Sequence, residues 1–287
     1  MRALLLLSLT LVPAVLVAQS AEDLHNWNQP FPPHPVAGNL YYVGSNELGC
    51  YLVATKAGHI LINTGFEQTV PLIRESVEKL GFRFADIRIL LASQAHQDHV
   101  AGLALARKLT GAKVFVMQGD EEVVRDGGAS DFYYADQMRW APCPVDRVLA
   151  DGDAVELGGT TLIAHRTAGH TRGCTTWTMT VNDDGKPLRV VIVGGVNVNP
   201  GFRLVGNAKY PSIADDFAAT FRTLAGLDCD IFLGAHGSYY GLKDKYARSR
   251  TEGWKAFVDP AGYRAFVARS ERAFAEKLRA QRTHPTP

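Results

Sequence analysis

The segment SQAHQDHVAGL, residues 93–103, places three possible metal ligands within four positions. His96, Asp98 and His99 form an HxDH pattern, and Gln94 lies two positions before His96. Zinc in proteins is held by imidazole and carboxylate groups at roughly 2.0–2.2 Å, so these side chains suit a zinc ion. An HxDH pattern also arises by chance, and a metal site therefore requires further ligands from elsewhere in the chain.

Two further histidines stand directly after segments that have the pattern of strands. His170 lies in AGHTRG, after TTLIAHRTAG, and His236 follows DIFLGA. His96 and His99 likewise follow the buried strand pattern DIRILLAS. Loops on a rigid scaffold are where functional residues concentrate, and these four histidines with Asp98 can meet at one edge of a sheet. The combination predicts a metal centre.

The remaining five histidines have simpler interpretations. Three lie in polar or proline-rich terminal segments and are expected on the surface: His25, His34 and His284. Two lie within strand patterns and are expected to be structural or exposed: His59 and His165.

The elements that must position the centre alternate between strands and helices. In the first half, the periodicity of apolar residues predicts a hairpin over 40–45 and 50–63, helices over 69–81 and 100–111, and strands over 86–93 and 112–118. In the second half it predicts three strands within 147–169, a hairpin over 174–195, a strand over 230–237, and helices over 212–227 and 260–282. Ser212 and Asp215 form a capping-box pattern at the start of the helix over 212–227. Two similar halves, with strands inside and helices outside, predict one layered α/β domain over 21–287.

The first 20 residues have the pattern of a secretory signal peptide. Arg2 precedes an apolar run over 3–17, and the small residues Ala18 and Ser20 precede a possible cleavage site. The run is too short for a spanning helix, which needs about 20 residues, although a short membrane anchor is the alternative. We expect cleavage after Ser20 and a periplasmic or secreted protein with no membrane association afterwards.

The overall composition is that of an ordinary globular protein, at 46% hydrophobic and 21% charged residues. The 30 Lys and Arg residues balance the 29 Asp and Glu residues, so nothing indicates a nucleic-acid partner. Export permits disulfides, but four cysteines allow three pairings, and the sequence does not choose among them: Cys50, Cys143, Cys174 and Cys229. We expect a monomer.

Three segments of the chain resemble, in their order, the motifs of the metallo-β-lactamase superfamily, which are HxHxDH followed by two later histidines. These segments are SQAHQDH, AGHTRG and GAHG. The resemblance covers essentially the whole mature chain. NWNQPFPP near the N-terminus, NPGF at 199–202 and YPSIADDF at 210–217 resemble class B β-lactamases of the third subclass. The fold that this implies is a four-layer αββα sandwich of two similar halves, in agreement with the predicted order of elements.

The resemblance implies two zinc sites, and so up to two zinc ions per chain. Its first site corresponds to Gln94, His96 and His170, and its second to Asp98, His99 and His236. Gln94 stands where most members have histidine, although a GOB-type branch of the subclass also carries glutamine. Because an amide oxygen is a neutral and weaker ligand than imidazole, we expect the second site to bind zinc more tightly.

The activity implied is that of a zinc-dependent β-lactamase, acting on penicillins and cephalosporins and extending to carbapenems. Zinc lowers the pKa of a bound water towards about 7, and the resulting hydroxide attacks the amide carbonyl. Asp98 is the catalytic residue, because it can bind zinc and orient the attacking water. No serine or cysteine nucleophile is expected. Val196 stands where the subclass often has a substrate-binding serine, which leaves Asn197, Asn199 and Arg172 as candidate substrate contacts.

Another zinc hydrolase of the same fold, of lactonase or thioesterase type, is the alternative. Such members place a bridging aspartate at the end of the strand after the GH motif, where this chain has Gly195 and Val196. The other β-lactamase subclasses place a cysteine ligand beside that position. A non-catalytic zinc-binding protein remains a third possibility, and β-lactam hydrolysis with and without a chelator separates the three.

Overall fold

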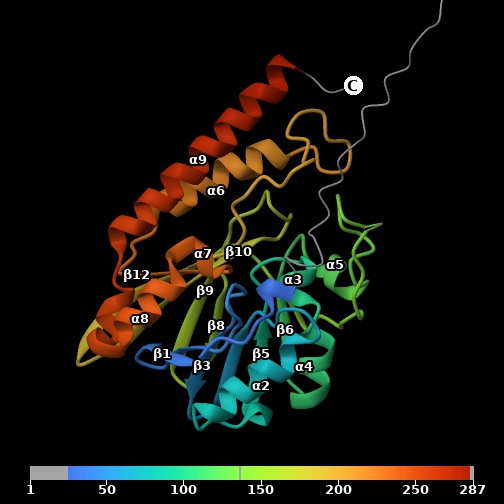
Figure 1. Cartoon of the computed structure of the whole chain (residues 1–287). Helices are drawn as coiled ribbons and strands as arrows, with labels where there is room; N and C mark the ends of the chain where they lie inside the picture. The colour runs from blue at the N-terminus through green and yellow to red at the C-terminus, as the bar shows by residue number, and fades with distance from the viewer. Residues whose placement is uncertain (1–24, 136, 285–287) are drawn as a thin grey trace, which may run out of the picture.

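The computed structural model describes residues 25–135 and 137–284, and the expected signal peptide lies outside them. Two mixed sheets face each other with helices on their outer sides, which confirms the predicted αββα sandwich (Figure 1). The first sheet runs β1 (His34–Ala37), β2 (Leu40–Tyr42), β3 (Tyr51–Thr55), β4 (Gly58–Ile62), β5 (Ile87–Leu91), β6 (Lys113–Met117) and β7 (Arg147–Leu149). The second runs β12 (Ile231–Gly234), β11 (Lys186–Val193), β10 (Thr175–Asp183), β9 (Thr160–Arg166) and β8 (Ala154–Leu157).

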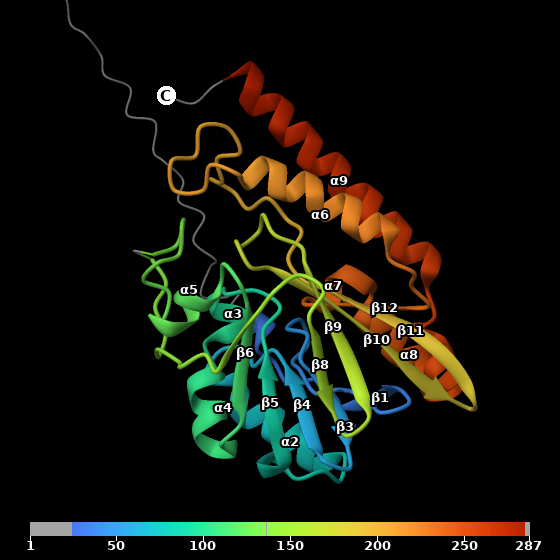
Figure 2. The ribbon, with the colours of Figure 1, turned by 180° about the vertical axis from the view of Figure 1, so that it is seen from behind.

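The helices fall into two outer groups, which lie on opposite sides of the sheets in the view from behind (Figure 2). Beside the first sheet are α2 (Thr69–Lys79), α3 (Gln97–Val100), α4 (Leu103–Thr110) and α5 (Glu121–Arg125), with the 3-10 turn η1 (Phe84–Asp86). Beside the second are α6 (Ile213–Gly226), α7 (Gly237–Tyr240), α8 (Leu242–Glu252) and α9 (Pro260–Thr283), with η2 (Gly253–Phe257). No helix in the described ranges is long and apolar enough to cross a membrane.

Two apolar clusters hold these layers together. One joins the facing sides of the sheets and continues under α6 and α9; Trp177 lies in it, fully buried, and donates from its indole nitrogen to the Ala92 carbonyl at 3.2 Å. The other fills the space between the first sheet and helices α2 and α4, through residues such as Leu61 and Ile73. Burial of apolar area at roughly 25 cal/mol per Å² is the main source of stability in such a layered fold. The strand ends that carry the site are therefore fixed by packing on both sides.

Most predicted elements form, and the exceptions have physical causes. The helix expected over 100–111 starts earlier and is divided at Gly102 into α3 and α4. A side chain at Gly102 would approach the Thr64 carbonyl oxygen to 2.7 Å, so glycine is needed where the chain passes close to the loop after β4. Helix α8 was not predicted, because its sequence LKDKYARSRTE is mostly charged and buries only Leu242 and Lys245.

The structure corrects two expectations, the capping box of α6 and the exposure of His34, and it shows the state of the cysteines. The capping box at α6 is wrong: Ser212 makes no capping bond, and its hydroxyl donates instead to Asp216 Oδ2 at 2.9 Å. His34 is not on the surface but buried in β1, where its ring stacks on Tyr42 and burial lowers its pKa to about 4. All four cysteines are buried free thiols, so none of the three disulfide pairings forms in this structure.

Candidate metal centre

The histidines at the strand exits are held at the starts of two short helices. His96 precedes α3 and His236 precedes α7, both with extended backbone angles, so each strand turns directly into a helix. The loop after β5 is fixed by Asn63, whose Oδ1 accepts from the Ser93 amide at 2.8 Å. The loop after β12 is tied to the first sheet, because the Gly49 amide donates to the Ala235 carbonyl at 2.8 Å. Ligand-bearing loops from both sheets thus meet at one edge of the sandwich.

Asp98, His99 and His236 form one cluster of donor atoms, which all lie within 4.8 Å of one another. His99 Nε2 lies 3.1 Å from Asp98 Oδ2 and 3.2 Å from His236 Nε2. His236 Nε2 lies 3.5 Å from the same Asp98 oxygen. Two imidazole nitrogens and a carboxylate oxygen converging in this way have the composition of a zinc site.

Gln94, His96 and His170 form a second cluster beside the first. His96 Nδ1 lies 3.1 Å from His170 Nε2. Gln94 Oε1 is buried and has no hydrogen-bond partner, which is costly for a buried acceptor unless something else satisfies it. A side-chain carbon at Gly195 would lie 2.5 Å from Gln94 Oε1 and would overlap the His170 ring, so glycine leaves the space that these two side chains occupy.

Some of the nitrogens that point away from the clusters face oxygen atoms, whereas His96 Nε2 and His99 Nδ1 are buried without a hydrogen-bond partner. His170 Nδ1 lies 2.6 Å from the Asn197 carbonyl, which only accepts, so Nδ1 carries the hydrogen and Nε2 keeps its lone pair. His236 Nδ1 lies 3.5 Å from Glu47 Oε1, and His96 Nε2 lies 3.8 Å from Asp131 Oδ2. Outer partners of this kind orient the histidine ligands of metal ions.

Burial also gives these groups the protonation states that a cation requires. It lowers the pKa of His96 to about 4 and that of His170 to about 3, so both rings are neutral near pH 7. Burial alone would raise the pKa of Asp98, but the neighbouring His99, which also hydrogen-bonds to it, holds that pKa well below its usual value. Neutral imidazoles and an ionised carboxylate are the metal-binding forms, and the residues present therefore fit two cations.

Comparison with known proteins agrees with this geometry. Residues 50–236 match the model of the metallo-beta-lactamase superfamily. The chain belongs to the metallo-β-lactamase superfamily. It is 48% identical to the FEZ-1 metallo-β-lactamase from Legionella gormanii, with a TM-score of 0.88 over 89% of this chain and 98% of that one.

Two further structures refine the placement. The class B3 di-zinc metallo-β-lactamase LRA-12 from an Alaskan soil metagenome is 32% identical, with a TM-score of 0.85 over 91% of this chain and 98% of that one. GOB-18 from Elizabethkingia meningoseptica is 35% identical, with a TM-score of 0.84 over 89% and 95%. The chain is thus a subclass B3 metallo-β-lactamase, a zinc hydrolase.

The cleft of this metallo-β-lactamase has a volume of about 180 Å³. It is lined by Trp27, Glu47, Gln94, His96, Asp98, Tyr134, Met138, His170, Asn197, Asn199, His236, Ser238 and Tyr239. Asn197 Nδ2 donates to the Tyr239 hydroxyl at 3.3 Å, and Asn199 Nδ2 donates to the Tyr134 hydroxyl at 3.1 Å. Sequence reasoning gave no role to the two tyrosines, whose segments carry no ligand pattern. It used NWNQPFPP, which contains Trp27, only for the resemblance to a family.

Arg172 is not among the residues that line the cleft. Its guanidinium donates to the Lys209 carbonyl and lies over the Tyr210 ring, 5.3 Å from the centroid. These contacts hold the guanidinium of Arg172 beside Lys209 and Tyr210. A role for Arg172 in binding substrate therefore stays a prediction.

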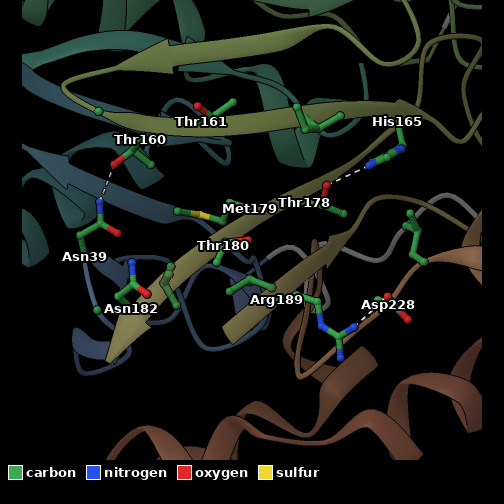
Figure 3. Close-up of a pocket in the computed structure, with 16 residues that line it drawn as sticks. Asn39, Thr160, Thr161, His165, Thr178, Met179, Thr180, Asn182, Arg189 and Asp228 are labelled. Atoms are coloured by element: carbon green, nitrogen blue, oxygen red, sulfur yellow. Dashed lines mark hydrogen bonds and ion pairs between the residues drawn. The ribbon is translucent and has the colours of Figure 1, made fainter. Parts of the chain in front are cut away.

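The two histidines assigned to strands lie away from this cleft. His165 borders a wider hollow of about 960 Å³ on the outward face of the second sheet, where it hydrogen-bonds Thr178 Oγ1 at 2.8 Å (Figure 3). His59 lies in β4, and its ring meets Phe82 edge to face. In the part of the chain that the structure describes, the hollow has no cluster of metal-binding side chains like that of the cleft. Arg189, the cation among the residues labelled in Figure 3, pairs with Asp228 at 2.7 Å.

Proposed function

We propose that this metallo-β-lactamase hydrolyses the amide bond of penicillins, cephalosporins and carbapenems in the cleft beside Asp98. The observation that carries the proposal is that residues of two donor clusters line a single cleft. Gln94, His96 and His170 would hold one zinc ion, and Asp98, His99 and His236 the other. With glutamine at the first position, the first site would be of the GOB type, and the second site would bind zinc more tightly.

Zinc bound there would supply Lewis acidity and lower the pKa of a bound water from 15.7 towards about 7. The chain itself supplies orientation and proton handling. Asp98 is ionised and keeps 10% of its side chain exposed to the cleft, so it can accept a hydrogen bond from the attacking water. The buried imidazoles stay neutral and cannot protonate that water before it reacts.

Asn197 and Asn199 are the residues proposed to bind the substrate carboxylate. Both line the cleft and present amide groups that donate hydrogen bonds to nearby hydroxyls. Val196 is only 1% exposed and offers no polar atom, so it cannot take the place of a substrate-binding serine.

Hydrolysis of nitrocefin by the purified, zinc-loaded protein tests the proposed activity. We expect turnover that is lost after removal of zinc with a chelator and returns when zinc is added back, because the water needs the cation to ionise near pH 7. A protein that cleaves a lactone or thioester but not nitrocefin would belong to the alternative class. Nitrocefin turnover that survives complete removal of zinc would contradict the mechanism.

We also propose that the enzyme is exported and acts as a monomer. Expression of the full chain in a bacterial host should yield a periplasmic protein whose N-terminus, by mass spectrometry, lies at Ala21. The physical reason is the short apolar run over 3–17, which suits signal-peptide recognition and is too short to span the membrane. Recovery of a chain that still begins at Met1, in the membrane fraction, would instead indicate an anchor.

A further inference from the structure

Asp120 is a buried carboxylate directly behind the first donor cluster. It lies after β6, before α5, and is 1% exposed. Its Oδ2 accepts hydrogen bonds from the Ala95 amide at 2.8 Å and from Thr171 Oγ1 at 2.7 Å. Its Oδ1 accepts from the Gly173 amide at 2.7 Å. All three partners are neutral donors, so the carboxylate acts as a common acceptor between two loops.

The two loops are those that carry the first cluster. Ala95 stands between Gln94 and His96, and Thr171 directly follows His170. The loops approach Asp120 closely, since a side-chain carbon at Gly173 would lie 2.6 Å from the Asp120 amide nitrogen. Asp120 itself belongs to neither loop and does not line the cleft. It is placed to act on the cluster through its neighbours and not through contact with substrate.

The second cluster is held by other bonds. The Thr64 amide donates to the His99 carbonyl at 3.0 Å, and the Gly102 amide donates to the Gly65 carbonyl at 3.0 Å. On the other side, the Gly237 amide donates to the Glu47 carbonyl at 2.7 Å. These contacts fix α3 and the start of α7 to the first sheet without using Asp120. Loss of Asp120 should therefore affect the two clusters unequally.

We infer that Asp120 is a positioning residue that sets the separation between the loop of Gln94 and His96 and the loop of His170. Through that separation it controls zinc affinity at the first site. This inference rests on the ligand assignment in the proposed function. A carboxylate is needed at position 120 because both of its oxygens accept hydrogen bonds from the two loops. An asparagine there would keep one accepting oxygen, and its NH2 group would face a donor.

The test is a zinc titration of demetallated wild type and Asp120→Asn, read by competition with a chelating dye. Since outer partners of metal ligands change affinity by about 10–100-fold, we expect a fall of that size at the first site. Affinity at the second site should stay within about threefold of wild type, which is well below that range. Thr171→Val removes a single hydrogen-bond donor to Asp120, so it should lower zinc affinity at the first site by less than Asp120→Asn does. This variant tests the inference if Asp120→Asn does not fold.

Asp259→Asn is the matched control. Asp259 also accepts from a backbone amide, that of Gly262 at 2.8 Å, and pairs with Lys245 at 3.0 Å, but it caps α9 away from the cleft. The Asp259→Asn variant should have a lower melting temperature than the wild type and unchanged zinc affinity at both sites. Equal losses at both sites in Asp120→Asn, or unchanged first-site affinity in Asp120→Asn or Thr171→Val, would overturn the inference. A wild type that binds no zinc and leaves nitrocefin intact would refute the proposed function instead.

Discussion

Replacement of His236 by alanine is expected to nearly abolish β-lactam hydrolysis and to remove zinc from the second site. His236 Nε2 lies 3.2 Å from His99 Nε2 and 3.5 Å from Asp98 Oδ2, so its loss removes one of three converging donors. Removal of an outer partner of a ligand typically costs about 10–100-fold in metal affinity or activity, so loss of a ligand itself should lower kcat/KM by at least about 100-fold. His99→Ala should behave in the same way.

The measurement is kcat/KM for nitrocefin together with zinc content after gel filtration. His59→Ala and His165→Ala are the controls, because both remove an imidazole from a strand away from the cleft. Both controls should keep near-wild-type activity and zinc content. Equal damage from His165→Ala and His236→Ala would show that the activity does not depend on the cluster.

Replacement of Gln94 by histidine is expected to tighten zinc binding at the first site. The neutral amide oxygen is a weaker donor than imidazole, and the first site otherwise has only His96 and His170. Mutation of the outer partners of a metal ligand changes metal affinity by about 10–100-fold. Exchange of the ligand itself should therefore raise zinc affinity at the first site by at least about tenfold. In the wild type, the second site should fill first, and the two binding constants should be clearly separated.

A zinc titration of the demetallated proteins against a chelating dye measures both constants. Gln97→His is a matched control: it adds a histidine to the same motif, but Gln97 donates to the Arg139 carbonyl and does not line the cleft. It should leave both constants unchanged. Equal, tight binding of two zinc ions by the wild type would show that the amide is not a weak ligand here.

The sequence by itself determined the layered fold and the candidate metal ligands that gather at the cleft. Helices α2, α6 and α9 could be predicted because their apolar residues repeat at helical spacing, and β5 and β12 because short apolar runs end in polar loops. These signals are local. They place His96, His170 and His236 just past strand ends, and the layered arrangement then brings the strand ends to one edge.

Only the tertiary structure decided how the side chains around these residues are used. Arg172 stands two positions from His170, yet it faces the Lys209 carbonyl, 37 positions away in the chain. Asp120 has no motif of its own, and its partners Ala95 and Gly173 lie 25 and 53 positions away. The direction of a side chain and the partners of a buried carboxylate are set by which segments pack together, and the spacing of neighbouring residues does not encode that packing.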